Sequence, residues 1–431
     1  MQNRNALTFL FLANIVSGFA QGISMLAIPW YFKSVLNEES LFGVIYAGAT
    51  LFTMVWSLYS GLLVDKYSRK SNFFFINLIG GVVLLSIAIT GFVLGQVPMA
   101  LIAAVFVTTM LVYNIHYPAL YAFAQEVSRP EDYGKVNSYI EIQGQSTSVI
   151  SGAFAALLIS GTTNGHLNLM GFNLTMPFDI TPWKLQDIFM LNAATYFLAL
   201  VFISLIKYKP HIERVVDTGT IYERLKTGFS FLKNHTNISV FGQASFMVFV
   251  VLIVEVHFLL PSYINNHLQL SADVYASAEI YYAIGALFAG FAIRRLFSKT
   301  NEVKAVIILM ALSAIFFFMA SVTNSLLLFF FISVMFGVTN AGIRVLRITW
   351  LFNHVPNNVI GRTNSIFNMS NIFLRATLTS IFALPFFAQG NNIVYAYGAC
   401  AFFVALWIVP LLVRYRKIVA SKGLVVKPMS E

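Results

Sequence analysis

The sequence has few charged residues and almost no cysteine. Asp, Glu, Lys and Arg make up 10% of its 431 residues and hydrophobic residues 58%, and the mean hydropathy is +0.76. Soluble globular chains carry about 25% charged residues, so a water-soluble fold is excluded. The single cysteine, Cys400, excludes a disulfide framework and a cysteine-based zinc site, and leaves the redox compartment open.

The chain also lacks the motifs of common enzyme classes. It contains no His-Glu-x-x-His, no Gly-x-x-x-x-Gly-Lys-Ser/Thr and no Gly-x-Ser-x-Gly. Without a phosphate-binding loop, direct coupling to ATP is not expected, and no nucleophile–base pair can be proposed for an intramembrane enzyme. We therefore predict a protein that is not an enzyme and that needs neither a cofactor nor a metal.

Long apolar runs dominate the sequence that is present. A membrane-spanning helix needs about 20 predominantly apolar residues, and the first run, 6–32, is too long for a signal-peptide core. Hydropathy predicts twelve spans: 6–32, 40–63, 72–94, 98–126, 138–160, 186–207, 237–262, 272–297, 303–321, 325–354, 365–387 and 392–413.

The net charge of +10 is unevenly distributed between the two sides of these spans. With the N-terminus in the cytoplasm, 22 of the 27 Lys and Arg residues lie on the side of the termini and two, Lys33 and Lys184, on the other. Cytoplasmic loops are enriched in Lys and Arg. The pattern predicts that both termini are cytoplasmic and that the partner is a lipid bilayer, not nucleic acid.

Two connecting segments have patterns of their own. Between the sixth and seventh spans, Ile221, Leu225, Phe229 and Leu232 recur at helical spacing among charged residues, which predicts an amphipathic helix on the membrane surface. On the external side, the segment 161–184 alternates apolar and polar residues and predicts a small hairpin.

A short charged loop joins the second and third spans. It reads Gly61-Leu-Leu-Val-Asp65-Lys-Tyr-Ser68-Arg69-Lys70 and resembles the signature loop of the major facilitator superfamily of secondary transporters, except at Ser68, where a second glycine is common. The resemblance implies a conformational latch formed by Gly61, Asp65, Arg69 and Lys70. The alternative is that its basic residues only orient the protein in the membrane.

The same resemblance implies an all-α membrane protein with twelve transmembrane helices in two pseudo-symmetric six-helix bundles. An internal repeat agrees, because Gly134-Lys-Val-Asn-Ser-Tyr139 opens the fifth span and Gly361-Arg-Thr-Asn-Ser-Ile366 the eleventh. The predicted domains are an N-terminal bundle, a linker with the amphipathic helix, a C-terminal bundle and a cytoplasmic tail: 1–207, 208–236, 237–415 and 416–431.

Polar residues within the spans are candidates for the substrate cavity, because they are costly in lipid. The first span carries a stripe of Asn14, Ser17, Gln21 and Ser24, which would bind an uncharged solute or join helices. In the fourth span, His116 is either a cavity residue or a hydrogen-bonded packing residue. The resemblance places the first, fourth, seventh and tenth spans around the cavity.

The tenth and eleventh spans carry the intramembrane cations. Asn340, Arg344 and Arg347 share one face of the tenth span, where they would bind an anionic group or gate the cavity; Arg347 could instead reach the cytoplasmic interface. The eleventh span has a polar seam that ends in a cation, and a similar seam opens the fifth span. The seams are Asn364, Asn368, Asn371 and Arg375, and Asn137, Glu141, Gln145 and Ser148.

Carboxylates inside spans are candidates for proton coupling. A carboxyl group that is removed from water holds its proton more readily, so it can load and release a proton in the neutral range. Glu255 is the first candidate, with His257 beside it in sequence, and Glu141 is the second. Glu255 and Glu279 could instead neutralise an arginine.

Within the superfamily, the chain is most similar to the bacterial macrolide-efflux type, in the charged loop, in Tyr117-Pro-Ala-Leu120, in Leu225–Asn234 and in Pro356–Ser365. The resemblance implies a monomeric drug:proton antiporter of the bacterial inner membrane, with a small amphipathic substrate and protons as partners. Two alternatives stay open. The substrate could be an anionic or zwitterionic solute such as a siderophore or lysophospholipid, or the protein could be a membrane sensor that does not transport.

Overall fold

The structure is a computed structural model that describes residues 4–128, 133–162, 165–175, 177–208 and 221–421. Eleven helices in the described part are long and apolar enough to cross a membrane. Contacts divide the chain into two units, one comprising Met1–Asp217 with Gln269–Ile280 and the other Thr218–Leu268 with Tyr281–Glu431. Each unit is described separately below.

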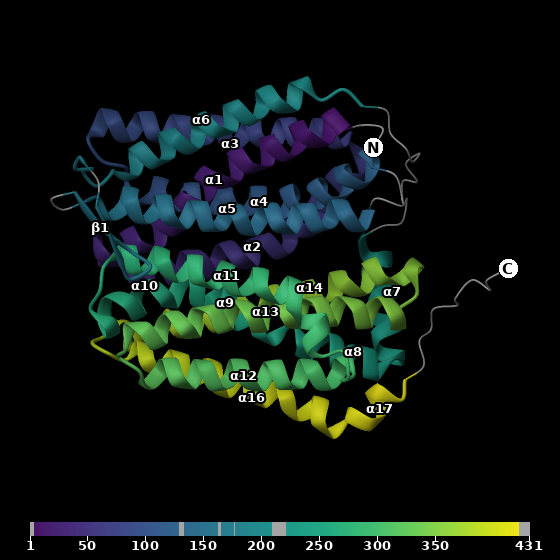
Figure 1. Ribbon diagram of the computed structural model, residues 1–431. Coiled ribbons are helices and arrows are strands. Elements are labelled where there is room, and N and C mark those ends of the chain that lie inside the picture. Colours follow the sequence, from purple (N-terminus) through teal and green to yellow (C-terminus); the bar gives the residue numbers. More distant parts are fainter. Residues whose placement is uncertain (1–3, 129–132, 163–164, 176, 209–220, 422–431) are drawn as a thin grey trace. The chain divides into compact units, whose positions relative to one another are not determined.

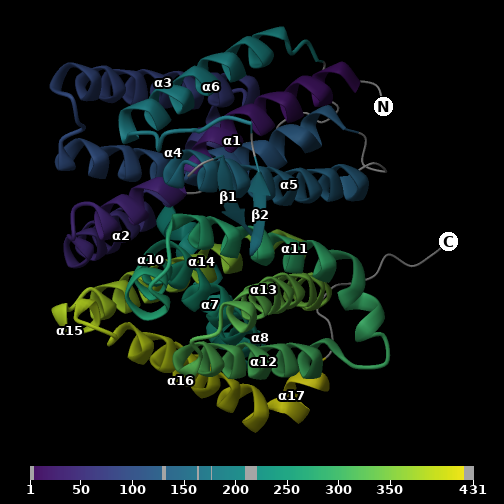
Figure 2. The same cartoon turned by 60° about the vertical axis from the view of Figure 1, so that its left-hand side comes forward.

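Unit 1 contains the first six spans. They are α1 (Arg4–Ser34), α2 (Glu39–Lys66), α3 (Arg69–Leu94), α4 (Met99–Val127), α5 (Tyr133–Ser160) and α6 (Leu185–Leu205). Helix α6 packs on α1 and α3, and α1 also contacts α4 and α5 (Figures 1 and 2). Gly80 and Gly81 allow the close approach of α3 to α6, because a Cβ at either position would lie 3.3 Å from a side-chain atom of Tyr196 or Phe197.

A two-stranded hairpin lies between α5 and α6, as the alternating pattern predicted. Strand β1 (His166–Leu169) pairs antiparallel with β2 (Phe172–Thr175), and Met170 and Gly171 form the turn. Both turn residues have positive φ, 57° and 79°, which a two-residue type I′ turn requires and which a methionine adopts only at a cost. The Met170 amide donates to Ser277 Oγ at 2.8 Å, so the start of α11 (Ala272–Leu296) holds the turn.

Unit 2 contains the rest of α11 together with the helices on either side of it in the chain, from residue 221 onward. They are α7 (Ile221–Asn234), α8 (Thr236–Ser245), α9 (Met247–Val254), η2 (Glu255–Leu259), α10 (Leu260–Ser262), η3 (Tyr263–Leu268), α12 (Glu302–Val322), α13 (Leu326–His354), α14 (Asn357–Phe382), α15 (Pro385–Ala388), α16 (Ile393–Val413) and α17 (Tyr415–Val419). Helix α12 packs on α13 and α16 (Figure 2). Gly285 and Gly337 bring α11 against α13, where any Cβ would collide with the facing backbone.

The seventh predicted span, 237–262, is interrupted and longer than expected. It runs from Thr236 to Leu268 through α8, α9 and α10 and through two π-helical segments, η2 and η3. The Leu260 amide donates to the Glu255 carbonyl, one residue further back than in an α-helix. Pro261 follows immediately and has no N–H to bond the His257 carbonyl, which accounts for the wide turn at this place.

The eleventh predicted span, 365–387, has different ends in the structure. Helix α14 runs from Asn357 to Phe382, and the chain bends before Pro385, which cannot continue a helix. With 26 residues α14 is long enough to span, yet it is not among the eleven apolar helices. Two arginines and five asparagines account for the difference: Asn357, Asn358, Arg362, Asn364, Asn368, Asn371 and Arg375.

The predicted amphipathic helix is present as α7, and it packs on α14. Leu232 and Gly228 are buried, but Phe229, predicted on the apolar face, is 62% exposed. A Cβ at Gly228 would lie 2.9 Å from the Arg362 backbone carbon. The backbones of α7 and α14 thus approach each other at Gly228. The next residue, Phe229, is turned away from α14.

Candidate functional site

A chain of neutral polar side chains crosses three helices of unit 1. Asn14 of α1 accepts at Oδ1 from His116 Nε2 of α4 (2.6 Å) and donates from Nδ2 to Gln143 Oε1 of α5 (2.5 Å). Gln143 Nε2 then donates to Thr147 Oγ1 at 3.4 Å. Because an amide oxygen only accepts, His116 must carry its proton on Nε2. The structure therefore brings together two predicted residues, Asn14 and His116, with two that were not predicted.

Two cavities adjoin this chain. A cavity of about 800 Å³ lies between α1 and α5, and one of about 60 Å³ lies among α1, α4 and α5. Gln143 and Thr147 line both cavities. The larger one is lined by Leu7, Thr8, Phe11, Ile15, Tyr139, Ile142, Gln143, Ser146, Thr147 and Ile150. None of these residues is charged, so the lining is apolar with hydroxyl and amide groups added, which suits a partly polar organic molecule.

The predicted polar stripe on α1 has two different environments. All four residues are buried. Ser17 Oγ donates to the Ala13 carbonyl within α1. Ser24 Oγ accepts from Asn192 Nδ2 at 2.9 Å and so joins α1 to α6. Asn14 and Gln21 line the smaller cavity, and Gln21 Nε2 has no hydrogen-bond partner among the described residues.

Aromatic rings surround the histidine. Phe73 lies 5.0 Å from the His116 ring, and Tyr113 and Tyr117 lie 5.0 Å from each other on α4. Both tyrosines line the smaller cavity and are more than a third exposed. The spacing of Tyr113, His116 and Tyr117 at i, i+3 and i+4 is the signal that could have identified this face.

Glu279 belongs to the part of α11 that groups with unit 1. Its Oε1 has no hydrogen-bond partner in the described part of the chain, and it is close enough to Tyr113 to act on it electrostatically. Glu279 thus supplies, in the neighbourhood of Tyr113, the acidic group that the neutral chain itself lacks. Glu141, the other acidic candidate on this side, lies outside the residues whose side chains are described.

Glu255 is enclosed within unit 2. It lies at the first wide turn and is 3% exposed, and its Oε1 accepts from Tyr397 Oη of α16 at 2.8 Å. The ring of Tyr263 lies 4.4 Å from that of Tyr397, and its hydroxyl donates to the Ala320 carbonyl at 2.7 Å. Glu255 is thus bound by a phenol in an aromatic environment. His257, two residues later in the chain, interacts electrostatically with Arg375 of α14.

The predicted face of α13 divides between two partners. Asn340 Nδ2 donates to Tyr282 Oη of α11 at 2.5 Å. Arg347 is buried, donates from Nη1 to the Ser245 carbonyl at 3.0 Å, and places its guanidinium carbon 3.5 Å from the centre of the Phe246 ring. Arg344 lies one turn earlier and is partly exposed. Arg347 therefore contacts the broken seventh span, through a carbonyl and an aromatic ring.

Asn371 of α14 is a buried amide. It is 1% exposed, and neither its Oδ1 nor its Nδ2 has a partner among the described residues. Arg375 follows one turn later and is partly exposed. A buried amide of this kind costs free energy unless something else satisfies it, so this part of α14 can accept a polar group.

The charged loop of unit 1 has partners that the sequence did not reveal. Arg69 Nε lies 3.7 Å from Glu126 Oε2 at the end of α4, and Tyr208 Oη donates to Glu126 Oε1 at 3.1 Å. Lys70 Nζ donates to the last carbonyls of α6, those of Ser204 and Ile206. Cations are favourable at a helix C-terminus. Gly61 and Asp65 lie outside the residues whose side chains are described.

Ser68 has a structural role in this loop. Its hydroxyl accepts from the Ser71 amide at 3.0 Å and caps the N-terminus of α3. A serine at this position satisfies an amide that a glycine could not, so the departure from the family pattern has a structural role at the start of α3.

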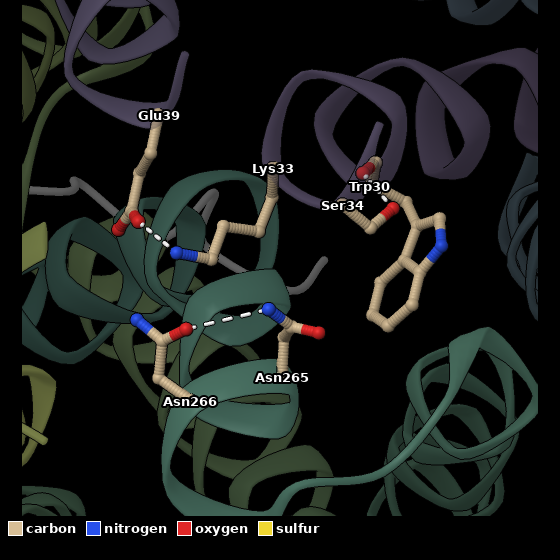
Figure 3. A network of polar contacts seen from close by, with 6 residues as sticks. All are labelled: Trp30, Lys33, Ser34, Glu39, Asn265 and Asn266. Atoms are coloured by element: carbon tan, nitrogen blue, oxygen red, sulfur yellow. Dashed lines mark hydrogen bonds and ion pairs between the residues drawn. The ribbon is translucent and has the colours of Figure 1, made fainter. Parts of the chain in front are cut away.

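A buried ion pair joins the C-terminal end of α1 to the start of α2. Figure 3 shows Lys33 Nζ and Glu39 Oε2, which are 2.7 Å apart. Both side chains are nearly inaccessible to solvent. Lys33, counted above as one of two external cations, is therefore neutralised locally.

The described residues hold no cluster of three or more His, Cys, Asp or Glu side chains suited to a metal ion. The candidate site is thus built from amides, hydroxyls, aromatic rings and isolated acids. Such groups bind and orient a solute; they supply no nucleophile paired with a base.

Comparison with known proteins identifies the family. The family model of the Major Facilitator Superfamily matches residues 10–377, and no curated protein sequence matches. Among solved structures, a nucleoside transporter, NupG, is 13% identical, with 97% of this chain and all of that chain covered and a TM-score of 0.68. A D-xylose-proton symporter is 12% identical over 95% and 97%, with a TM-score of 0.69. The POT family transporter PepTSo is 11% identical over 98% and 100%, with a TM-score of 0.70.

At these identities the likeness shows the fold, and the predicted all-α membrane fold is confirmed. The predicted absence of enzyme activity agrees with the family and with these structural neighbours. The family match covers most of the chain, including the charged loop and the neutral polar chain of unit 1. The protein therefore belongs to the major facilitator superfamily and is a multi-pass membrane transporter.

Proposed function

We propose that the protein exports amphipathic organic molecules of the macrolide type in exchange for protons, by alternating access. The observation that supports this best is the cavity of about 800 Å³ in unit 1, which has no charged lining residue and shares Gln143 and Thr147 with the neutral polar chain. A solute with a large apolar surface and several hydroxyl groups fits such a lining. Asn14, Gln21 and His116 would then contact it or position the residues that do.

The anionic or zwitterionic alternative depends on unit 2. Arg344, Arg375 and the amide of Asn371 would have to bind the negative group. Arg347 contributes less to that alternative, because a carbonyl and an aromatic ring already occupy its guanidinium. Competition experiments separate the two classes: a neutral macrolide and an organic anion of similar size should compete unequally for transport.

Two carboxyl groups compete for the role of proton carrier. A carrier must exchange protons with water in one state and be shielded in another. Glu279 has an oxygen without a hydrogen bond among the described residues and is only partly buried, whereas Glu255 is enclosed and bonded to Tyr397. We therefore place Glu279 first and Glu255 second, with His257 and Glu141 as further members of the set. One proton that moves down 100 mV supplies about 2.3 kcal/mol.

The charged loop would act as the latch through Gly61, Asp65, Arg69 and Lys70. The contacts of Arg69 with Glu126 and of Lys70 with the end of α6 support an anchoring role for the basic pair. The proposed setting is the bacterial inner membrane, with both termini cytoplasmic and the protein acting as a monomer. The domain boundaries 1–207, 208–236, 237–415 and 416–431 belong to the same proposal.

The test is proton movement in reconstituted vesicles on addition of erythromycin. The unaltered chain should move protons, Glu279→Gln should abolish the movement, and Glu38→Gln should leave it unchanged, since Glu38 is an exposed acid between α1 and α2. Proton movement that survives Glu279→Gln and disappears with Glu255→Gln would reverse the order of the two acids. A chain that shows neither proton movement nor solute counterflow would be the membrane sensor of the second alternative.

A further inference from the structure

A polar cavity of about 360 Å³ lies in unit 2, apart from the residues assigned to transport. It is lined by Asn234, His235, Thr236, Asn237, Ile238, His354, Arg414 and Ser421. Seven of these eight residues are polar, one is a permanent cation, and none is acidic. A cavity of this volume is within the range that small-molecule sites occupy.

The cavity lies where three membrane spans end. Thr236 begins one span, His354 ends another, and Arg414 follows directly after the span Ile393–Val413. Arg414 also separates α16 from α17. The ends of spans lie at the level of lipid headgroups, where phosphate groups concentrate and where basic pockets between helices bind anionic headgroups.

The walls of the cavity are held by contacts on each side. The His235 ring stacks on Phe231 at 4.2 Å and bonds the Phe231 carbonyl through Nδ1, while the His354 ring stacks on Trp350 at 3.9 Å. Asn237 Nδ2 donates to the Lys417 carbonyl of α17 at 3.1 Å. These contacts fix the positions of the lining groups before any ligand arrives, which lowers the entropic cost of binding.

The charge of Arg414 is left for a ligand. Among the described residues, its guanidinium has no acidic partner within ion-pair distance. The next cations along the chain, Arg416 and Lys417, are exposed on α17 and do not line the cavity. An arginine inside a polar hollow binds a phosphate through two parallel hydrogen bonds, which an exposed cation in water does far less well.

We propose that this cavity is a binding site for a phosphate-bearing anion at the membrane surface, with Arg414 as its principal ligand and the side chains of Thr236 and Asn237 as further donors. The anion is either the headgroup of an acidic phospholipid or a free phosphate. Neither source takes part in the proposed transport cycle, so the site can fail while the transport proposal stands.

The experiment uses the purified full chain in detergent and follows its thermal midpoint during titration. The probes are short-chain phosphatidylglycerol, short-chain phosphatidylcholine and inorganic phosphate. Phosphatidylglycerol should raise the thermal midpoint of the unaltered chain by much more than phosphatidylcholine does, since a ligand that binds only the folded state stabilises that state. If inorganic phosphate alone reproduces the shift, the source is a soluble anion; if only phosphatidylglycerol does, it is a lipid.

The variants distinguish a built site from general surface charge. Arg414→Gln should weaken the apparent affinity about tenfold, the usual loss for one charged hydrogen-bonding partner. Arg414→Lys keeps the charge at the end of α16 but loses the paired bonds, so it should fall in between. Arg416→Gln, two residues away and exposed, should change the affinity less than about twofold.

Three results would overturn the proposal. The first is an equal shift of the thermal midpoint with phosphatidylglycerol and phosphatidylcholine and no shift with phosphate. The second is an equal loss of apparent affinity for Arg414→Gln and Arg416→Gln. The third is an Arg414→Gln chain that is less stable without any probe but responds to each probe as the unaltered chain does. The last result would mean that Arg414 only offsets the carbonyls at the end of α16.

Discussion

The two units treat polarity in the membrane differently. In unit 1 the polar chain that reaches the cavity is neutral, from His116 through Asn14 and Gln143 to Thr147. In unit 2 two ionisable groups are enclosed with fixed partners: Arg347 contacts a carbonyl and an aromatic ring, and Glu255 accepts from a phenol. Charge costs more than a neutral dipole in a medium of low polarity, so charged groups need fixed partners. Neutral groups can be left to exchange partners with a solute.

Loss of an enclosed charge should have the largest effect on stability. Arg347→Ala removes a guanidinium from Phe246 and Ser245 and leaves a space in the packed core of unit 2. We expect the unfolding free energy to fall by about 2–4 kcal/mol, as for other truncations of large buried side chains, measured from thermal or denaturant unfolding in detergent. Arg344→Ala, on the same face but partly exposed, is the matched control and should cost less than half as much.

Loss of the central neutral residue should affect transport more than stability. Asn14→Leu leaves His116 and Gln143 without their shared partner, and we expect erythromycin transport to fall about tenfold. Asn192→Leu is the control, because Asn192 is also a buried amide that bonds across helices, to Ser24, but lines neither cavity. Equal transport losses in the two variants, per folded molecule, would remove the distinction between the cavity chain and an ordinary helix contact.

Removing the partner of the enclosed acid should have a moderate effect. Tyr397→Phe deletes only the hydroxyl that donates to Glu255, and hydrogen bonds within membrane proteins average about 0.6 kcal/mol with a maximum near 1.7. We expect a stability loss in this range and unchanged coupling between erythromycin and proton movement. A change in the number of protons moved per solute would instead draw Glu255 into the transport cycle and contradict the comparison.

The smallest effect is expected where only the ring beneath Arg347 changes. Phe246→Leu keeps most of the apolar volume but removes the π face, so we expect a loss of about 0.5–1 kcal/mol. Comparison of Phe246→Leu in the unaltered chain and in Arg347→Ala isolates the interaction between the two groups. If the loss is the same in both backgrounds, the ring and the guanidinium do not stabilise each other.

The helices could be predicted from sequence because each span has its own apolar length and its own polar ends. The bounds of α1 and α13, for example, differ from the predicted 6–32 and 325–354 by no more than two residues. Short-range pattern also located the hairpin. These features depend on residues that are neighbours along the chain, so no knowledge of distant contacts was needed.

The partners of the polar residues could not be predicted in the same way. On helix α5 the sequence indicated a seam with Gln145 and Ser148, and Ser148 lines the smaller cavity, but Gln143 and Thr147, which form the chain with Asn14, were missed. The contact of Gln143 with Asn14 depends on the rotation of α5 against α1, which the sequence of α5 alone does not reveal. Glu126 was missed for a similar reason, because a single acid at the end of α4 gains its role only from Arg69 and Tyr208 of other elements.

The wide turns in the seventh span change how its surface should be drawn. An α-helix rotates by about 100° per residue. A π-helical turn contains about one residue more than an α-helical turn. A helical wheel drawn continuously from Thr236 to Leu268 therefore loses its phase at Glu255 and again at Tyr263, the first residues of η2 and η3. Side chains that share a face on such a wheel diverge in the folded protein, so substitutions chosen from it would sample several different surfaces.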